Sequence, residues 1–357
     1  MSDLITLPDS VTATIFGEIS KGAPVTLYTL ANKNGMSVSV MDYGATLVKV
    51  VVPDRLGKFD DVVLGFDSFS PYLTLKDFFG ATIGRYANRI ACGRFTLDKV
   101  HYQLARNDRH NALHGGIHGF DKRMWKMEPV DTGSLSVRFT LLSGDGEEGY
   151  PGNLRVSVTY SLSEDNEMRI SYHATTDKPT IINLTNHSYF NLGGAGNGTI
   201  LNEVLTIYAD TFTPVDENLI PTGEMRRVAG TPCDFRRPTV IGLRLKELGD
   251  DPLGYDYHFV LNKGHSSAWV LAATVDDRQT GRRMEVSTDQ PGIQFYTANL
   301  LNGSSVGKGI KRYPQYAGLT LETQHCPDSP NHNDFPSTVL RPGEVFRSST
   351  VYAFSVT

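Results

Sequence analysis

Ionisable side chains gather in four stretches of the sequence that also contain glycine and, in the first three, Phe or Tyr. The stretches are GRYANRI (84–90), NALHGGIHGFD (111–121), NLTNHSYFNLGG (183–194) and GLTLETQHCPDSPNH (318–332). A glutamate and a histidine from such stretches are able to act as general base and general acid. Aromatic rings suit the apolar face of a sugar, and Asn, Arg, Asp and Gln side chains suit its hydroxyl groups. The residue types therefore favour proton transfer on a sugar.

Other chemistries fit these stretches less well. His110, His114 and His118 are spaced four apart, as metal ligands on one face of a helix would be, but the glycines among them disfavour a helix. His325 and Cys326 are adjacent, whereas a catalytic Cys and its His usually come from distant segments. No stretch has the glycine spacing of a nucleotide-binding loop. We therefore expect neither a metal ion nor an organic cofactor.

Two interpretations remain open for Glu322 from the residues around it. If 319–324 forms a strand, Glu322 points away from the face that carries Leu319 and Leu321. Most glutamates lie on the surface in contact with water, and this is the simpler interpretation. The alternative is a carboxylate that projects into a concave face of a sheet.

The elements that must position these side chains are mainly strands, because apolar and polar residues alternate with period two. The alternation is clearest over residues 135–141, 154–162 and 168–172, and further strands are predicted at 36–41, 47–52, 204–209, 269–275 and 352–356. A hairpin turn is expected at 164–167, and short helices at 67–79 and 240–248. Strands that do not alternate with long helices argue against a parallel α/β sheet. We expect an all-β chain, a large antiparallel β-sandwich, forming one domain over residues 1–357.

Composition excludes several classes of protein. The 357-residue chain has a net charge of −5 and no long basic cluster, which argues against binding to nucleic acid. Its three cysteines do not suggest a disulfide framework. The sequence shows no signal peptide and no apolar run of 18 residues, so we expect no membrane segment. A cytoplasmic protein, monomeric or homodimeric, is the resulting expectation.

A family resemblance runs over nearly the whole chain. It is carried by DVVLGF (61–66), IGRYANRI (83–90), ALHGG (112–116), GFDKRMW (119–125), DGEEGYPG (145–152), INLTNHSYFNLGG (182–194), DENLIPTG (216–223), GYDYHF (254–259), QPGIQFYT (290–297), LETQ (321–324) and LRPGE (340–344). With these segments in this order, the sequence closely resembles the galactose mutarotase (aldose 1-epimerase) family. The resemblance implies that family's β-sandwich fold and its activity without a cofactor.

The resemblance also implies roles for individual residues. Glu322 falls on the family's general base and His187 on its general acid, with His114 second in rank for the acid role. The substrate-binding positions of the family fall on Asn88, Arg89, His114, His187, Ser188, Tyr189, Asp256, Gln294 and Glu322. Phe295 or another aromatic residue is expected to form an apolar platform for the sugar ring.

The implied reaction interconverts the α and β anomers of a free aldohexose such as galactose or glucose. Two alternatives remain. A hexose-6-phosphate 1-epimerase would need cations for the phosphate, which Arg226, Arg227, Arg236 or Arg237 would supply. A non-catalytic sugar-binding β-sandwich would keep the hydroxyl-binding residues without needing both Glu322 and His187.

Overall fold

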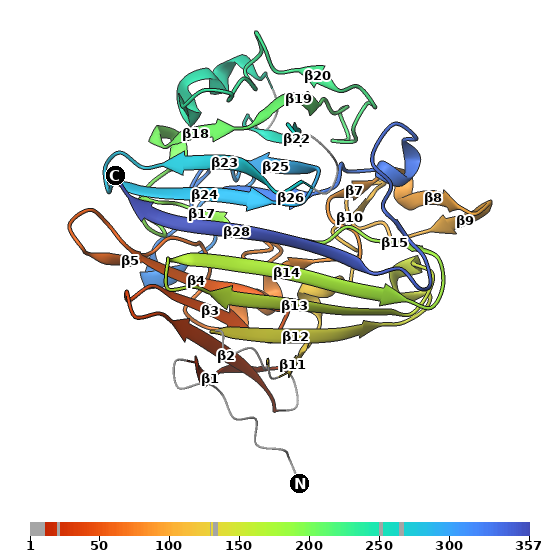
Figure 1. Cartoon of the computed structure of the whole chain (residues 1–357), viewed down its shortest axis with the longest axis horizontal. Coiled ribbons are helices and arrows are strands. Elements are labelled where there is room, and N and C mark those ends of the chain that lie inside the picture. Colours follow the sequence, from red (N-terminus) through yellow and green to blue (C-terminus); the bar gives the residue numbers. More distant parts are fainter. Residues whose placement is uncertain (1–10, 20–21, 129, 131–134, 250–252, 264–267) are drawn as a thin grey trace.

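The architecture consists of layered antiparallel sheets, seen in Figure 1 with the largest sheet across the middle. The computed structural model describes residues 11–19, 22–128, 130, 135–249, 253–263 and 268–357. The all-β expectation is confirmed, because these described residues build antiparallel sheets and only short helices.

Nine strands form the largest sheet, in the order β11-β12-β13-β14-β28-β24-β23-β18-β21. Their bounds are β11 Lys126–Glu128, β12 Ser136–Ser143, β13 Leu154–Leu162, β14 Glu167–Thr176, β28 Phe346–Val356, β24 Arg282–Thr288, β23 Val270–Asp276, β18 Val204–Ile207 and β21 Thr239–Val240. The alternation over 154–172 predicted β13, the turn and β14 correctly. Along β13 every second residue is buried, as expected for a strand with one face in the core.

A six-stranded sheet packs against this sheet, in the order β17-β26-β25-β22-β19-β20. Its strands are β17 Tyr189–Phe190, β26 Leu319–Gln324, β25 Gly292–Tyr296, β22 Asp256–Leu261, β19 Ala209–Thr213 and β20 Arg226–Arg227. Leu319, Leu321 and Phe295 from this sheet share the main apolar core with Val286 and Tyr352 of the nine-stranded sheet. The opposite face of the six-stranded sheet is therefore available for a site.

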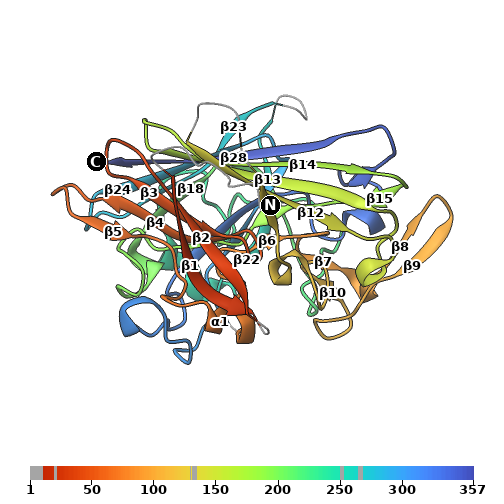
Figure 2. The same ribbon diagram turned by 90° about the horizontal axis from the view of Figure 1, so that it is seen from below.

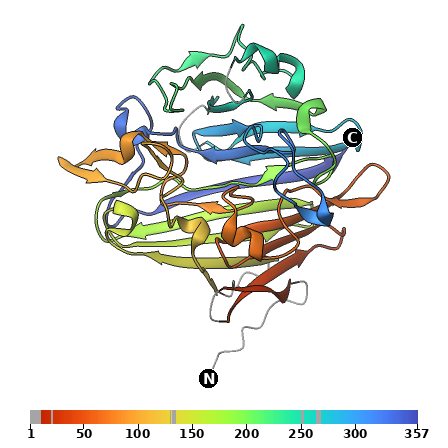
Figure 3. The same ribbon diagram turned by 180° about the vertical axis from the view of Figure 1, so that it is seen from behind.

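An N-terminal sheet and several two-stranded pieces complete the fold. The sheet contains β1 Val11–Ile19, β2 Ala23–Ala31, β3 Ser37–Met41, β4 Thr46–Pro53 and β5 Phe59–Asp61. The pairs are β6 Thr82–Ile83 with β16 Thr185–Asn186, β7 Arg89–Ile90 with β10 Ala112–Leu113, β8 Arg94–Leu97 with β9 Val100–Gln103, and β15 Thr180–Ile181 with β27 Val339–Leu340. Figure 2 shows β6, β7 and β10 beneath the nine-stranded sheet, and Figure 3 shows the loops on the side that Figure 1 hides.

Helical structure is shorter than the sequence predicted. Within 67–79 only α1, Ser70–Thr74, is an α-helix, and it ends where Leu75 adopts an extended backbone. The segment predicted at 240–248 forms a 3-10 helix, Ile241–Glu247. Other 3-10 turns are Ala91–Gly93, Phe120–Lys122, Glu147–Gly149, Ile200–Asn202, Lys308–Ile310 and Ser329–Asn331. In the described part of the chain, no helix is both long enough and apolar enough to cross a membrane.

Candidate active site

Glu322 lies in the middle of β26, and the alternation of that strand decides its environment. Leu319 and Leu321 enter the main core, so Glu322 points to the other face together with Thr320. Glu322 is only 2% exposed. The interpretation as a surface glutamate is thus wrong, and the alternative of a carboxylate on an inner sheet face is correct.

Two contacts define the position of the Glu322 carboxylate. The Thr320 hydroxyl donates to Oε1 at 3.0 Å, and the Nε2 atom of His187 lies 3.7 Å from the same oxygen. The other oxygen, Oε2, has no hydrogen-bond partner among the described residues. One oxygen is therefore held in place while the other is left for a bound molecule.

His187 sits between β16 and β17, and its backbone is tied to a neighbouring loop. Its N–H donates to the Ala81 carbonyl at 2.9 Å, and its own carbonyl accepts from the Gly80 N–H at 3.0 Å. In the described structure Nδ1 of His187 has no hydrogen-bond partner. The fixed backbone thus presents the imidazole to Glu322, a residue 135 positions later in the chain.

The segment around Asn88 and the loop containing His114 meet through the β7–β10 pair. In that pair Arg89 lies opposite Leu113, and the Asn88 backbone N–H donates to Nδ1 of His114 at 3.2 Å. Nδ1 of a neutral His114 is therefore the acceptor, and its proton is on Nε2. Asn88 and His114 both have positive φ angles, 62° and 52°, which turn their side chains into this corner. His110, His114 and His118 lie in turns and loops, as the glycines predicted.

Arg89, Asp256 and Gln294 form a hydrogen-bonded edge of the same site. Gln294 Nε2 donates to Asp256 Oδ1 at 2.6 Å, and Arg89 Nη1 lies 3.9 Å from Asp256 Oδ2. Asp108, which the sequence did not single out, accepts from Arg89 Nε at 2.8 Å. Gln294 lies directly opposite Glu322 in the ladder of β25 and β26. The structure therefore brings Gln294, Arg89 and Asp256 close to Glu322, and Asp108 holds the other side of the Arg89 guanidinium.

Ser188 and Tyr189 follow His187 in the chain, and the structure joins Tyr189 to the site, whereas the Ser188 hydroxyl turns to Asn186. The Ser188 hydroxyl donates to Asn186 at 2.5 Å, so it is already engaged within the protein. The Tyr189 ring packs against the His187 ring with 5.0 Å between centroids, and Tyr189 lies opposite Thr320 in the β17–β26 pair. Tyr189 thus forms a wall of the site.

The aromatic residue that borders the two histidines is Phe78, not Phe295. The Phe78 ring lies 4.9 Å from the His114 ring and 5.8 Å from the His187 ring, and the two imidazoles are 5.1 Å apart. Phe295 is completely buried and stacks on Tyr255. The prediction for Phe295 is therefore wrong, because its ring points into the core between the two large sheets.

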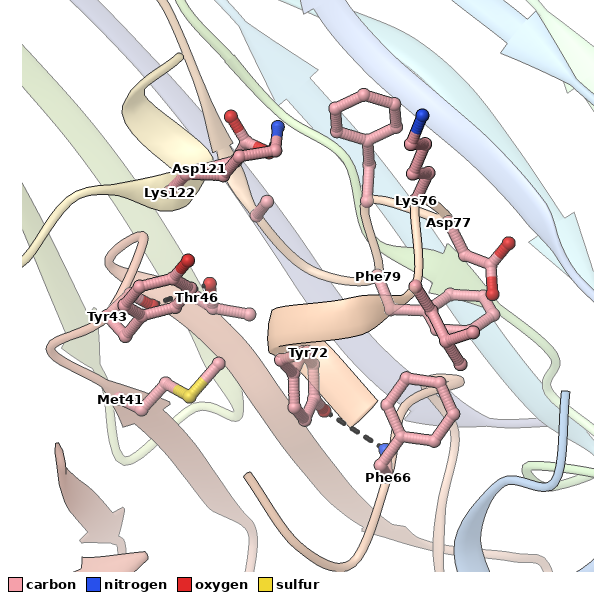
Figure 4. A pocket seen from close by; sticks show the side chains of 13 residues that line it. Met41, Tyr43, Thr46, Phe66, Tyr72, Lys76, Asp77, Phe79, Asp121 and Lys122 are labelled. Atoms are coloured by element: carbon pink, nitrogen blue, oxygen red, sulfur yellow. Dashed lines mark hydrogen bonds and ion pairs between the residues drawn. The ribbon is translucent and has the colours of Figure 1, made fainter. Parts of the chain in front are cut away.

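Phe78 also lines a small cavity, which Figure 4 shows with the other lining side chains. Its volume is about 30 Å³, and its lining includes Tyr43, Tyr72, Phe79 and Asp121. A space of this size holds about one water molecule, so it is too small for a hexose. Lys122 lies at its edge, with Nζ 5.2 Å from the Phe78 ring centroid.

Burial favours the neutral form of each ionisable group at the centre of the site and shifts its pKa accordingly. It raises the pKa of Glu322 to about 8, although the hydrogen bond from Thr320 opposes this rise. It lowers the pKa of His187 to about 4. The pKa of His114 falls well below its usual value because of burial and the nearby charged groups. A neutral His114 remains a hydrogen-bond donor through Nε2.

Thr320, Phe78 and Asp108 are site residues to which the sequence analysis gave no role. Thr320 is two residues from Glu322, so strand periodicity alone places both on one face and was a usable signal. Phe78 gave no such signal, since it lies in a segment expected to be helical. Arg85, in the same GRYANRI stretch as Arg89, is 2% exposed and donates to the carbonyls of Pro151 and Gly152, which identifies it as a structural residue.

These features define a class: a β-sandwich with a buried carboxylate–imidazole pair beside an amide, a guanidinium and a further carboxylate, side chains of the kinds used in acid–base chemistry. The aldose 1-epimerase family model matches residues 26–353. The chain is 44% identical to the galactose mutarotase of Homo sapiens over 347 residues, 97% of this chain and 99% of the relative. It is 42% identical to the aldose 1-epimerase of Escherichia coli (strain K12) over 340 residues, 93% and 96% of the two chains. The chain belongs to the aldose 1-epimerase family and is an isomerase by that membership.

Solved structures agree with this assignment. The GalM/aldose epimerase homologue from C. elegans has a TM-score of 0.85 at 33% identity, covering 93% of this chain and 99% of its own. The galactose 1-epimerase from Lactobacillus acidophilus NCFM has a TM-score of 0.83 at 33% identity, covering 97% and 98%. The predicted galactose-mutarotase-like β-sandwich is thereby confirmed.

Proposed function

We propose that this chain interconverts the α and β anomers of a free aldohexose such as galactose or glucose, with Glu322 as general base and His187 as general acid. The observation that carries the proposal is the buried pair itself, with Glu322 Oε1 3.7 Å from His187 Nε2. Family membership supports the reaction class.

The proposed reaction opens and closes the sugar ring. Glu322 Oε2 takes the proton of the C1 hydroxyl, and the electron pair of that O–H bond forms the C1 carbonyl. The C1–ring oxygen bond breaks at the same time, and its electron pair stays on the ring oxygen. His187 gives its proton to the ring oxygen. After rotation about C1–C2 each group acts in reverse, and the ring closes on the other face of the aldehyde. Each well-placed proton transfer contributes about 10²–10⁴-fold in rate.

The number of protons held by the buried pair supports the roles proposed for Glu322 and His187. Below the pKa of about 8 for Glu322 and above the pKa of about 4 for His187, the pair holds one proton, which burial places on the carboxyl group. The reactive form, ionised Glu322 with protonated His187, has the same number of protons. We infer that a bound sugar shifts this proton from Glu322 to His187, because its hydroxyls donate to the carboxylate and stabilise the charge.

The remaining groups hold the substrate in this proposal. Arg89 and Asp256 bind hydroxyl groups as donor and acceptor, with Gln294 fixing the Asp256 carboxylate at 2.6 Å. His114 donates through Nε2 to the region of the ring oxygen, and Asn88 completes that corner. His187 is preferred over His114 as the acid, since His187 is the histidine next to Glu322.

The hexose-6-phosphate alternative finds less support at two of its four candidate arginines, Arg226 and Arg236. Arg226 is paired with Glu224 at 2.7 Å, and Arg236 with Asp234 at 2.8 Å. Arginines already paired with carboxylates are poor candidates for a phosphate site. Initial rates on free galactose and on a hexose 6-phosphate separate the two activities.

Polarimetry on freshly dissolved α-D-galactose tests the proposed function directly. We expect the purified chain to accelerate the change in optical rotation well above the buffer rate. Saturable sugar binding without any acceleration would instead identify a non-catalytic sugar-binding sandwich.

We propose in addition that residues 1–357 form one domain that acts in the cytoplasm as a monomer or homodimer. The family match over 26–353 supports a single unit. Light scattering of the purified chain measures the oligomeric state, and one cooperative unfolding transition is expected for one domain.

A further inference from the structure

The face of the six-stranded sheet that carries Glu322 also carries polar side chains that the proposed proton transfers do not use. His258 on β22 lies opposite Gln294 on β25, and Gln294 lies opposite Glu322 on β26. Gln324 is on the same face of β26, two residues beyond Glu322. His258 is 1% exposed and Gln324 is fully buried, so both lie deeper than the substrate-binding edge.

Several atoms of this row have no hydrogen-bond partner within the described protein. They are both ring nitrogens of His258, both amide atoms of Gln324, and Oε1 of Gln294. Buried polar groups are almost always hydrogen-bonded, to the protein or to ordered water. So many buried polar atoms without partners on adjacent strands therefore indicate that a polar molecule binds between these side chains.

Gly292 explains how His258 and Gln324 come together. A Cβ atom on Gly292 would lie 2.1 Å from Nε2 of His258, so the imidazole lies against the bare backbone of this glycine. Gly292 is in turn opposite Gln324 in the β25–β26 ladder, where side chains on one face are about 5 Å apart. The side chains of His258 and Gln324 are thus neighbours. Gln294 lies next to them, two residues after Gly292 on β25.

The hydrogen-bonding capacities of these groups match water. Burial, with the nearby His325, lowers the pKa of His258 to about 3. A neutral imidazole offers one donor and one acceptor, and the Gln324 amide offers two donors and an acceptor. Buried water molecules typically form about three hydrogen bonds to such groups. A charged ligand has no counter-charge on these side chains.

We propose that His258 and Gln324 hold ordered water behind Gln294, and that this water fixes the Gln294 amide so that its Nε2 donates to Asp256. An ionised Asp256 only accepts hydrogen bonds, so the orientation of the Gln294 amide matters for the sugar-binding carboxylate. His258 acts here as a positioning residue that does not touch the sugar. The inference rests on the proposed function for its kinetic consequence, whereas the water site itself does not depend on activity.

The first test is a high-resolution crystal structure of the unmodified chain. We expect electron density for at least one water within hydrogen-bond distance of His258 and of Gln294 or Gln324. A dry site, or a direct His258–Gln294 hydrogen bond without water, would overturn the proposal. This experiment stays informative even if the chain does not accelerate mutarotation, so failure of the proposed function is recognised separately.

The second test compares His258→Leu with His258→Asn. We expect His258→Leu to raise KM for galactose about tenfold, which corresponds to about 1.4 kcal/mol, with a much smaller change in kcat. His258→Asn keeps a donor and an acceptor, so it should restore most of the affinity. Equal KM values for the two variants, or losses confined to kcat, would contradict a positioning role.

Two further variants separate positioning from a general loss of packing. Thr323→Val alters the opposite face of β26, where the Thr323 hydroxyl contacts Thr350, and it should lower stability with KM unchanged. Gln324→Leu removes the other water ligand and should raise KM as His258→Leu does, which provides the test if His258→Leu does not fold. An unchanged KM in folded Gln324→Leu would count against the proposal.

Discussion

Replacing Glu322 by glutamine is expected to abolish most activity and, above neutral pH, to stabilise the fold. The substitution is nearly isosteric, and the glutamine oxygen still accepts the hydrogen bond that Thr320 now gives to Glu322 Oε1 at 3.0 Å. An amide cannot take the C1 hydroxyl proton at working pH. Loss of a positioned base lowers the rate by about 10²–10⁴-fold.

The stability effect follows from the pKa of Glu322. Its value rises from 4.5 to about 8 on folding, so between these pH values the folded chain retains a proton that the unfolded chain has lost. Stability contributed by the protonated carboxyl is complete below pH 4.5 and is lost as the pH rises through 8. At about 1.36 kcal/mol per pKa unit the whole loss is about 5 kcal/mol, an upper figure for a group that relaxes on ionisation.

Glutamine stays neutral at every pH and avoids this loss. We therefore expect Glu322→Gln to exceed the wild type in free energy of unfolding near pH 9, by up to the about 5 kcal/mol that the pKa shift of Glu322 allows. Near pH 4.5 the two proteins should be about equally stable. Denaturant unfolding at both pH values measures the difference, and polarimetry measures the activity.

Glu203 offers a matched control for this experiment. Burial also raises its pKa to about 8, and its Oε1 accepts from the Leu192 N–H at 2.8 Å. Glu203→Gln should show the same pH-dependent stabilisation with unchanged mutarotation. Our reasoning is refuted if Glu322→Gln keeps more than about a tenth of the wild-type rate, or if its stability advantage does not grow between the two pH values.

Four further predictions concern the site. The pH profile of kcat/KM should be bell-shaped, with limbs near 4 and 8 that belong to the Glu322–His187 pair as a unit; a plateau extending past pH 10 would contradict the single shared proton. His187→Ala should lower kcat about 10²–10⁴-fold, whereas His114→Gln, which keeps a donor, should lower it less; the reverse order in polarimetry would assign the acid role to His114. Thr320→Val should reduce kcat about tenfold, because it frees the carboxylate to rotate, and Thr320→Ser should recover activity. Phe78→Ala should raise KM for galactose several-fold with an intact fold by circular dichroism, and an unchanged KM would exclude Phe78 as a wall of the site.

Local patterns in the sequence predicted the strands well. Strand alternation also carried information about Phe295 that the prediction of a sugar platform did not use. Period-two alternation located β13 and β14 and put Glu322 on the face opposite Leu319 and Leu321. The same rule places Phe295 on the other face of β25 from Gln294. The alternation alone therefore argues against Phe295 as a platform for the sugar. Neighbouring strand residues point to opposite faces, and a residue next to a site residue in sequence is therefore often outside the site.

Contacts between distant segments could not be predicted from local sequence patterns. Glu322 and His187 meet only because β16, β17 and β26 come together, and no local pattern encodes the 3.7 Å between their side chains. The Phe78 contacts with His114 and His187 depend on a loop whose backbone at Phe78 has a positive φ of 55°. The residue-by-residue roles came from the family resemblance, and the structure adds that these residues lie together.

Burial and catalysis are compatible at this site because the pair acts as one unit with one proton. Two separately ionised groups at 2% and 6% side-chain exposure would each carry a large desolvation cost. In the proposed mechanism the shared proton leaves the pair without net charge before a sugar binds, and sugar hydroxyls together with the fixed Thr320 donor stabilise the ionised form. Such preorganised donors act most strongly where water is excluded. Burial shifts the pKa values of Glu322 and His187 so that the unreactive neutral forms are favoured. We infer that the same burial strengthens the hydrogen bonds that stabilise the ionised, reactive form when substrate is bound.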